Sequence, residues 1–184
     1  MPIESFTFFT MLSWDRAQSL AGIAKKAATL DGEFWDVGCN GGGSAAIMKE
    51  AVPKSQIRLF DSFEGLPEST KEDGPGRAVG EFIIPYSEFL KRLGTVYKGW
   101  VPETFKGLEN SKIALAHVDL DYYKGTKEAL QFILPRIVLG GYVIVDDYDS
   151  YWVGVKPAAD ETIGSEFMKL DAPPEQGIWQ RIAI

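Results

Sequence analysis

Two pairs of aspartates in the C-terminal half of the chain have the residue types and spacing to bind a cation. Asp119 and Asp121 follow one apolar run, and Asp146 and Asp147 follow the next. Carboxylates that meet in one place repel one another unless a cation or a proton lies between them. Oxygen ligands alone favour a hard divalent cation such as Mg²⁺ or Ca²⁺, and the chain has no Cys/His spacing for zinc. These acids are candidate metal ligands. The alternative is that one of each pair caps the helix that follows, and Asp121 is the candidate cap in the first pair.

A glycine-rich segment, EFWDVGCNGGGSAAIM at residues 33–48, has the pattern of a ligand-binding turn. An apolar run, a glycine cluster and a helix start form the opening unit of nucleotide-binding α/β folds. Glycine allows positive φ and close approach of a ligand, and the helix end behind it presents free N–H groups. The alternative is a plain turn. The candidate binding residues are Gly38, Asn40, Gly42, Gly43 and Ser44, with Ser44 at an N-cap or first-turn position.

A further carboxylate, Asp61, ends the second predicted strand at residues 56–60. In nucleotide-binding α/β folds, an acid at this place accepts hydrogen bonds from two ribose hydroxyls, about twenty residues after the glycine turn. Asp61 lies 23 residues after Gly38, which agrees with this spacing. Asp61 and its neighbour Ser62 are therefore candidate cofactor residues, and the alternative for Asp61 is an ordinary helix N-cap.

The elements that must position these residues alternate between short apolar runs and amphipathic segments, which predicts a parallel α/β fold. Segment 112–118 is apolar throughout, as expected for a central parallel strand that is buried on both faces. Because ligands bind at the carboxyl ends of such strands, both aspartate pairs should lie at one edge of the sheet. The predicted helices cover residues 13–30, 44–52, 86–93, 125–134 and 157–163. In the third of these, Phe89, Leu90 and Leu93 are predicted to point inward. The predicted strands cover residues 34–37, 56–60, 96–100, 112–118, 142–145, 167–170 and 178–183.

Four other features have two interpretations each. The loop at residues 62–80 is long for a compact domain and is predicted to cover a substrate. Trp100 could flank an adenine ring, but a core position is the favoured interpretation. His117 is predicted to be a satisfied core histidine rather than a general base. Cys39 is predicted to pack rather than to act as a nucleophile, since no histidine lies near it in sequence.

The composition limits the class of protein. The 184 residues suit one domain over residues 1–184 with a short N-terminal extension. The net charge of −7 argues against nucleic-acid and anionic-membrane partners. A single cysteine rules out an internal disulfide, no apolar run is long enough to span a bilayer, and no signal peptide is recognisable. The expected location is the cytoplasm.

Five segments together carry a resemblance to a known family: DVGCNGGGSA, FDSFEGLPES, HVDLDYYKGTKEAL, LPRIVLGGYVIVDDYD and GIWQR. They occur in order from about residue 33 to the C-terminus, and DSFEGLP and VIVDDY are the most specific. The chain resembles the macrocin O-methyltransferase family. Members of this family methylate sugar hydroxyls of macrolides and related natural products, with S-adenosylmethionine and Mg²⁺ as cofactors.

The resemblance implies the fold and the site. The expected fold is a three-layer, Rossmann-like class I methyltransferase with a mostly parallel seven-stranded sheet and a C-terminal antiparallel strand. The resemblance assigns Mg²⁺ to Asp119, Asp146 and Asp147. It assigns S-adenosylmethionine to Gly38, the Gly42-Gly43-Ser44 turn and Asp61, and Asn40, Ser62 and Asp119 complete the predicted cofactor site.

The expected reaction is methyl transfer to a hydroxyl of a sugar or another small molecule with a vicinal diol, with Asp119 as the proton acceptor. The chain departs from the family in having little before its first helix and no histidine in the loop after the second predicted strand. Tyr122 stands where catechol-type enzymes have lysine, so the resemblance does not identify the general base. The sequence is compatible with a homo-oligomer but does not give the oligomeric state. The alternatives are a metal-dependent glycosyltransferase using Asp-x-Asp, a phosphatase with Asp119 as nucleophile, and a non-catalytic module that binds S-adenosylmethionine.

Overall fold

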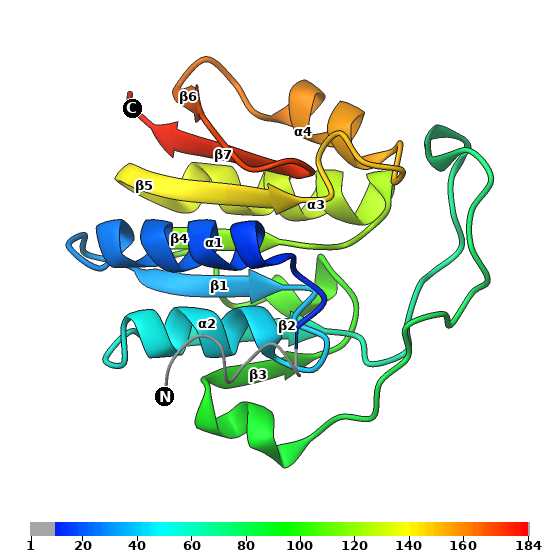
Figure 1. Cartoon of the computed structure of the whole chain (residues 1–184), viewed down its shortest axis with the longest axis horizontal. Coiled ribbons are helices and arrows are strands. Elements are labelled where there is room, and N and C mark those ends of the chain that lie inside the picture. The colour runs from blue at the N-terminus through cyan, green and yellow to red at the C-terminus, as the bar shows by residue number, and fades with distance from the viewer. Residues whose placement is uncertain (1–9, 184) are drawn as a thin grey trace.

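The computed structural model describes residues 10–183, so most of the predicted N-terminal extension (residues 1–9) lies outside the described residues. One sheet has the strand order β3-β2-β1-β4-β5-β7-β6 (Figure 1). Strand β7 is antiparallel to both of its neighbours, and the pairings among the first five strands are parallel. This confirms the seven-stranded, mostly parallel sheet. The strands are β1 (Glu33–Val37), β2 (Ile57–Asp61), β3 (Thr95–Lys98), β4 (Ile113–Val118), β5 (Ile137–Asp146), β6 (Phe167–Leu170) and β7 (Gln176–Arg181).

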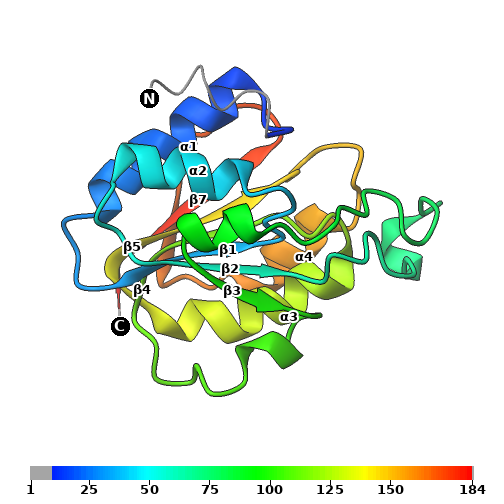
Figure 2. The same ribbon diagram turned by 90° about the horizontal axis from the view of Figure 1, so that it is seen from below.

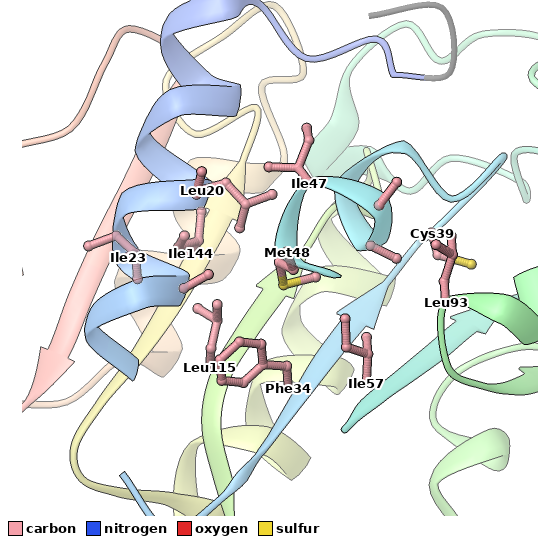
Figure 3. Packing of buried hydrophobic residues seen from close by; sticks show 14 of the residues in the cluster. Leu20, Ile23, Phe34, Cys39, Ile47, Met48, Ile57, Leu93, Leu115 and Ile144 are labelled. Carbon is pink, nitrogen blue, oxygen red and sulfur yellow. The ribbon is translucent and has the colours of Figure 1, made fainter. Parts of the chain in front are cut away.

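Helices cover both faces of the sheet and form the expected three layers (Figure 2). Helices α1 (Trp14–Ala27) and α2 (Gly43–Ala51) lie on one face, and α3 (Tyr123–Ile133) and α4 (Val155–Thr162) lie on the other. Each face has its own apolar cluster. Figure 3 shows the first cluster, in which side chains of α1 and α2 pack on the strands: Leu20, Ile23, Ile47, Met48, Phe34, Leu115 and Ile144. Within the described residues, no helix has the length and apolarity to cross a bilayer.

Local sequence signals explain most element boundaries. Helix α1 begins after Ser13, whose side chain accepts a hydrogen bond from the Arg16 amide, as the capping pattern predicted. Strand β4 is buried at every residue, which confirms a central position. Pro53 follows the end of α2, and a proline cannot continue a helix.

Two predicted elements differ clearly from the structure. The segment predicted as a helix over residues 86–93 is a short 3-10 helix, Glu88–Arg92, and its Phe89 side chain is 37% exposed rather than inward. Strand β5 begins at Ile137, earlier than predicted, and it includes Gly140 and Gly141. The register between β4 and β5 shifts at this glycine pair: Ile113 pairs with Ile137, whereas Leu115 pairs with Tyr142. A glycine pair inside a strand marks such an irregularity as well as a turn.

Candidate active site

A cavity of about 840 Å³ opens at the carboxyl ends of strands β1, β2, β4 and β5. Its wall includes the glycine turn after β1, the ends of β2 and β4, and the Asp146-Asp147 pair at the end of β5. Residues 99–103, after β3, and the aromatic pair Tyr151 and Trp152 line other parts of it. The predicted catalytic and cofactor-binding segments therefore meet at one edge of the sheet, as a parallel topology requires.

The three acids predicted to bind metal converge in this cavity. Asp119, Asp146 and Asp147 each offer a carboxylate oxygen, and these atoms all lie within 4.8 Å of one another. Asp119 follows β4, and its amide donates to the Val37 carbonyl at 2.8 Å, which attaches the turn to strand β1. Asp146 is the last residue of β5. Three convergent carboxylate oxygens form a donor set that fits a hard divalent cation.

The electrostatics of the cluster favour a cation. Burial, together with the charges of Asp146, Asp121 and Asp147, raises the pKa of Asp119 well above its usual value. Burial and the charge of Asp146 raise the pKa of Asp147 to about 6. Burial also raises the pKa of Asp146, although the nearby charges of His117 and Arg16 oppose this. Negative charge is therefore costly here unless positive charge compensates it.

Arg16 supplies such a charge, and the sequence analysis missed it. Its Nη1 donates to Asp146 Oδ2 at 2.8 Å and to Asp147 Oδ1 at 3.3 Å, and its Nη2 lies 3.8 Å from Glu175 Oε2. The arginine lies in the first turn of α1, 130 residues before Asp146 in the chain. Its only sequence signal is its place in the first turn of that helix, three residues after the Ser13 cap.

The prediction that Asp121 caps the following helix is wrong. Helix α3 has Tyr122 at its N-cap without a side-chain cap, and the Tyr123 amide donates instead to Asp73 Oδ1 at 2.7 Å. Asp121 has a positive φ of 61° and lines the cavity. Burial and the charges of Asp147 and Asp146 raise the pKa of Asp121 to about 7. Asp121 thus adds another carboxylate to the cavity wall beside the three convergent ones.

The glycine turn packs closely against neighbouring segments of the protein and also lines the cavity. Gly38 has φ +85°, and a Cβ there would lie 1.7 Å from the Asp119 carbonyl oxygen, so only glycine lets the two turns approach. Gly42 is the N-cap of α2, and a Cβ there would meet Leu90 Cδ2 at 2.6 Å. Gly42 thus packs against the 3-10 helix, while Gly38, Asn40, Gly43 and Ser44 line the cavity.

Ser44 lies in the first turn of α2, one of its two predicted positions. Its hydroxyl donates to Asp36 Oδ2 at 2.7 Å, and Asp36 Oδ1 lies 3.1 Å from His117 Nδ1. All three side chains are buried. Burial by itself would lower the pKa of His117, but the hydrogen bond and charge of Asp36 outweigh it and raise that pKa. His117 is absent from the cavity wall, which favours the core interpretation over a general base. Its Nε2 has no hydrogen-bond partner among the described residues, so the prediction that this histidine is fully satisfied is wrong.

Asp61 lies at the cavity and joins two loops. Its Oδ2 accepts from the Asn40 amide at 2.8 Å, and its Oδ1 accepts from the Phe63 amide at 2.7 Å. A loop follows Asp61, so the alternative of an N-cap is wrong. Burial raises the pKa of Asp61 despite these hydrogen bonds. The neighbouring Ser62 also lines the cavity, and its hydroxyl accepts from the Glu64 amide at 3.0 Å.

Two further predictions have different outcomes. Trp100 is 39% exposed and lines the cavity, so the favoured core interpretation of this residue is wrong. Cys39 is buried, and burial and the charges of Asp36 and Asp61 raise its pKa well above the usual value. A thiol in this environment is a poor nucleophile, as predicted.

The long loop after β2 runs past the carboxyl ends of the strands (Figure 1). Its Arg77 amide donates to the Tyr122 hydroxyl at 2.8 Å. The Arg77 guanidinium lies 5.2 to 5.6 Å from the ring centroids of Phe82, Tyr151 and Trp152. With the Asp73 cap of α3, these contacts connect the loop to the turn that carries the acids.

The chain is similar to known O-methyltransferases. Residues 86–168 match the model of the macrocin-O-methyltransferase (TylF) family. The 8-demethyl-8-(2,3-dimethoxy-alpha-L-rhamnosyl)-tetracenomycin-C 4'-O-methyltransferase of Streptomyces olivaceus is 29% identical, over 64% of this chain and 53% of the relative. The demethyldecarbamoylnovobiocin O-methyltransferase of Streptomyces niveus is 26% identical, over 82% of this chain and 66% of the relative. The chain thus spans between half and two thirds of the length of these relatives.

A solved structure shows the same fold. The crystal structure of a calicheamicin methyltransferase superposes with a TM-score of 0.77 at 22% identity, covering 94% of this chain and 81% of that chain. At this level of identity the likeness concerns the fold alone. The chain is thus similar to macrocin-O-methyltransferase (TylF) proteins over residues 86–168 and to two O-methyltransferases in sequence, and it shares its fold with a third.

Proposed function

We propose that this protein is an O-methyltransferase that transfers a methyl group from S-adenosylmethionine to a hydroxyl of a sugar or another vicinal-diol small molecule, with Mg²⁺ bound. One observation carries the proposal. Three carboxylate oxygens converge within 4.8 Å in the cavity that the glycine turn and Asp61 also line. A cofactor site beside a cation site with only oxygen ligands suits the transfer of a group from a cofactor to a hydroxyl that the cation activates.

The relatives support the acceptor class. Their names describe O-methylation of a rhamnosyl-tetracenomycin and of demethyldecarbamoylnovobiocin. The cavity of about 840 Å³ is within the range of ligand sites for small molecules. Exposed aromatic groups at its wall, such as Trp100 and Tyr151, offer apolar surface beside the charged cluster. An acceptor that carries a sugar hydroxyl beside an apolar group would fit both the charged cluster and the aromatic surface of the cavity.

The proposed roles follow from these positions. When bound, S-adenosylmethionine supplies an electrophilic methyl group, and the cation supplies positive charge that makes a neighbouring hydroxyl more acidic. Asp119, Asp146 and Asp147 would hold the cation. The cofactor would be held by Asp61, Ser62 and the glycine turn, where Gly38, Asn40, Gly43 and Ser44 line the cavity. Gly42 would contribute by shaping the turn.

The acceptor hydroxyl must lose its proton to a base. Asp119 is the proposed acceptor of this proton, directly or through water. Asp121 is a second candidate that the structure adds, because it lines the same cavity and lies outside the convergent set of three oxygens. The two candidates make different predictions. Loss of the Asp119 carboxylate should weaken cation binding and methyl transfer together, whereas loss of the Asp121 carboxylate should slow transfer with cation binding retained.

The test is a methylation assay with radiolabelled S-adenosylmethionine and a panel of rhamnosides and other glycosides that carry vicinal hydroxyls. We expect transfer that requires Mg²⁺ or Mn²⁺, stops with a chelator, and falls by at least about 100-fold in Asp119→Asn and Asp146→Asn. Glu161→Gln, which alters an exposed ion pair with Lys127, is the matched control. Transfer that is unchanged by the chelator and by both aspartate variants would refute the cation-dependent proposal. Binding of S-adenosylmethionine without transfer to any acceptor would favour a non-catalytic module.

A further inference from the structure

Arg16 occupies an unusual position for a cation, next to a site that is proposed to bind another cation. Its side chain is only 11% exposed, and the side chain of its closest partner, Asp146, is 2% exposed. The guanidinium contacts both acids of the pair, at 2.8 Å to Asp146 and 3.3 Å to Asp147. An ion pair this well shielded from water keeps much of its electrostatic strength.

Two of the three acids, Asp119 and Asp146, have contacts that do not involve Arg16. Asp146 is the last residue of β5 and pairs with Gln176 of β7 in the sheet. The Gln176 amide group also donates to Asp146 Oδ1 at 3.2 Å. Asp119 is held by its backbone hydrogen bond to Val37. Removal of the arginine would therefore change the charge at the cluster more than it would change the positions of these two acids.

The guanidinium of Arg16 makes its polar contacts with carboxylates. Its Nε is buried and has no hydrogen-bond partner in the described part of the chain. Within the described residues, Nη1 of the guanidinium contacts Asp146 and Asp147, and Nη2 lies near the more distant Glu175. A buried N–H without a partner costs free energy, so the guanidinium is held by the carboxylates rather than by a complete hydrogen-bond set of its own.

We propose that Arg16 is an internal counter-cation of the metal site: its guanidinium offsets part of the negative charge of Asp146 and Asp147 when no metal is present and competes with a divalent cation for them. This inference rests on the proposed cation site and adds a residue that sets its affinity. The arginine keeps the acid cluster stable in the metal-free protein, because buried carboxylates without a counter-charge are costly. The same positive charge opposes a second cation at the same oxygens.

The test is calorimetric titration of Mn²⁺ into the wild-type protein, Arg16→Gln and Arg16→Lys. At a separation of a few ångströms, removing one like charge should strengthen Mn²⁺ binding roughly tenfold or more in Arg16→Gln. Arg16→Lys keeps the charge and should bind Mn²⁺ within about threefold of wild type. The metal-free Arg16→Gln protein should melt at a lower temperature than wild type and recover more of its stability with Mn²⁺. Arg58→Gln is the matched control, since Arg58 pairs with Glu33 at 2.7 Å away from the cavity and should leave Mn²⁺ binding unchanged.

A second measurement uses the unaltered protein and does not depend on the folding of a variant. If Mn²⁺ competes with the guanidinium, saturating Mn²⁺ should accelerate modification of Arg16 by phenylglyoxal, followed by mass spectrometry of the peptide. Mn²⁺ binding to Arg16→Gln that equals or falls below wild type would overturn the inference while leaving the cation site in place, as would Mn²⁺ that slows the modification. Absence of Mn²⁺ binding in every variant would overturn the proposed cation site as well.

Discussion

Gly38 connects the glycine turn to the acid cluster, and replacing it with alanine tests that connection. A Cβ at residue 38 would lie 1.7 Å from the Asp119 carbonyl oxygen, whereas real Cβ atoms essentially never approach closer than 3.0 Å. The Asp119 backbone must therefore move by more than 1 Å. This movement would break or weaken the 2.8 Å hydrogen bond between the Asp119 amide and the Val37 carbonyl. We expect Gly38→Ala to lower both the stability of the fold and the affinity of the cation site.

The magnitude follows from two contributions. An L-residue at positive φ costs about 1–2 kcal/mol relative to glycine. Loss of a buried backbone hydrogen bond costs about 1–3 kcal/mol. Gly38→Ala should thus lower the free energy of unfolding by about 2–5 kcal/mol, which a domain of ordinary stability can survive. Gly107→Ala is the matched control, because Gly107 has the same φ of +85° but no atom within 4 Å of the added Cβ. It should lose only about 1–2 kcal/mol.

The assay is urea denaturation of wild type and both variants, together with Mn²⁺ titration of the folded proteins. Gly38→Ala should lose more stability than Gly107→Ala and bind Mn²⁺ more weakly than wild type. Equal losses in the two variants, together with Mn²⁺ binding in Gly38→Ala as tight as in wild type, would refute the reasoning that Gly38 is required by its approach to Asp119.

Three further predictions concern other parts of the molecule. Asp73→Ala removes the cap of α3 and the bonds to Thr70, and should cost about 2 kcal/mol in urea denaturation and speed amide exchange at Tyr123. Gly22→Ala fills an exposed position of α1 with no atom within 4 Å of the new Cβ, and should stabilise the protein by about 0.5–1 kcal/mol in the same assay. Cys39 should react with iodoacetamide at pH 8 more than roughly tenfold slower in the folded than in the unfolded protein, because burial limits access and raises the thiol pKa.

Each of these expectations can fail in a specific way. Unchanged exchange at Tyr123 in Asp73→Ala would mean that the loop contributes nothing to the helix cap. A loss of stability in Gly22→Ala would mean that α1 does not present this residue to solvent. Reaction of Cys39 at the same rate in folded and unfolded protein would contradict its burial in the glycine turn.

Local patterns in the sequence were sufficient to predict the sheet and the meeting of the acids. The apolar run at residues 112–118 predicted a central strand, and β4 is buried throughout. Aspartates placed directly after two such strands had to converge, because parallel strands end at a common edge. The convergence of Asp119, Asp146 and Asp147 is therefore a consequence of topology that strand prediction alone can reach.

Only the tertiary structure decided what surrounds those acids. Arg16 reaches Asp146 across 130 residues of chain, and Asp73 caps a helix that begins 50 residues later. Asp121, expected as the cap, is thereby left in the cavity. No periodicity or spacing marks such contacts, because they depend on side chains from distant segments meeting within about 3 Å after the layers have packed. The sequence determined by itself where the carboxylates gather, and the packed fold determined which charges and hydrogen bonds they meet there.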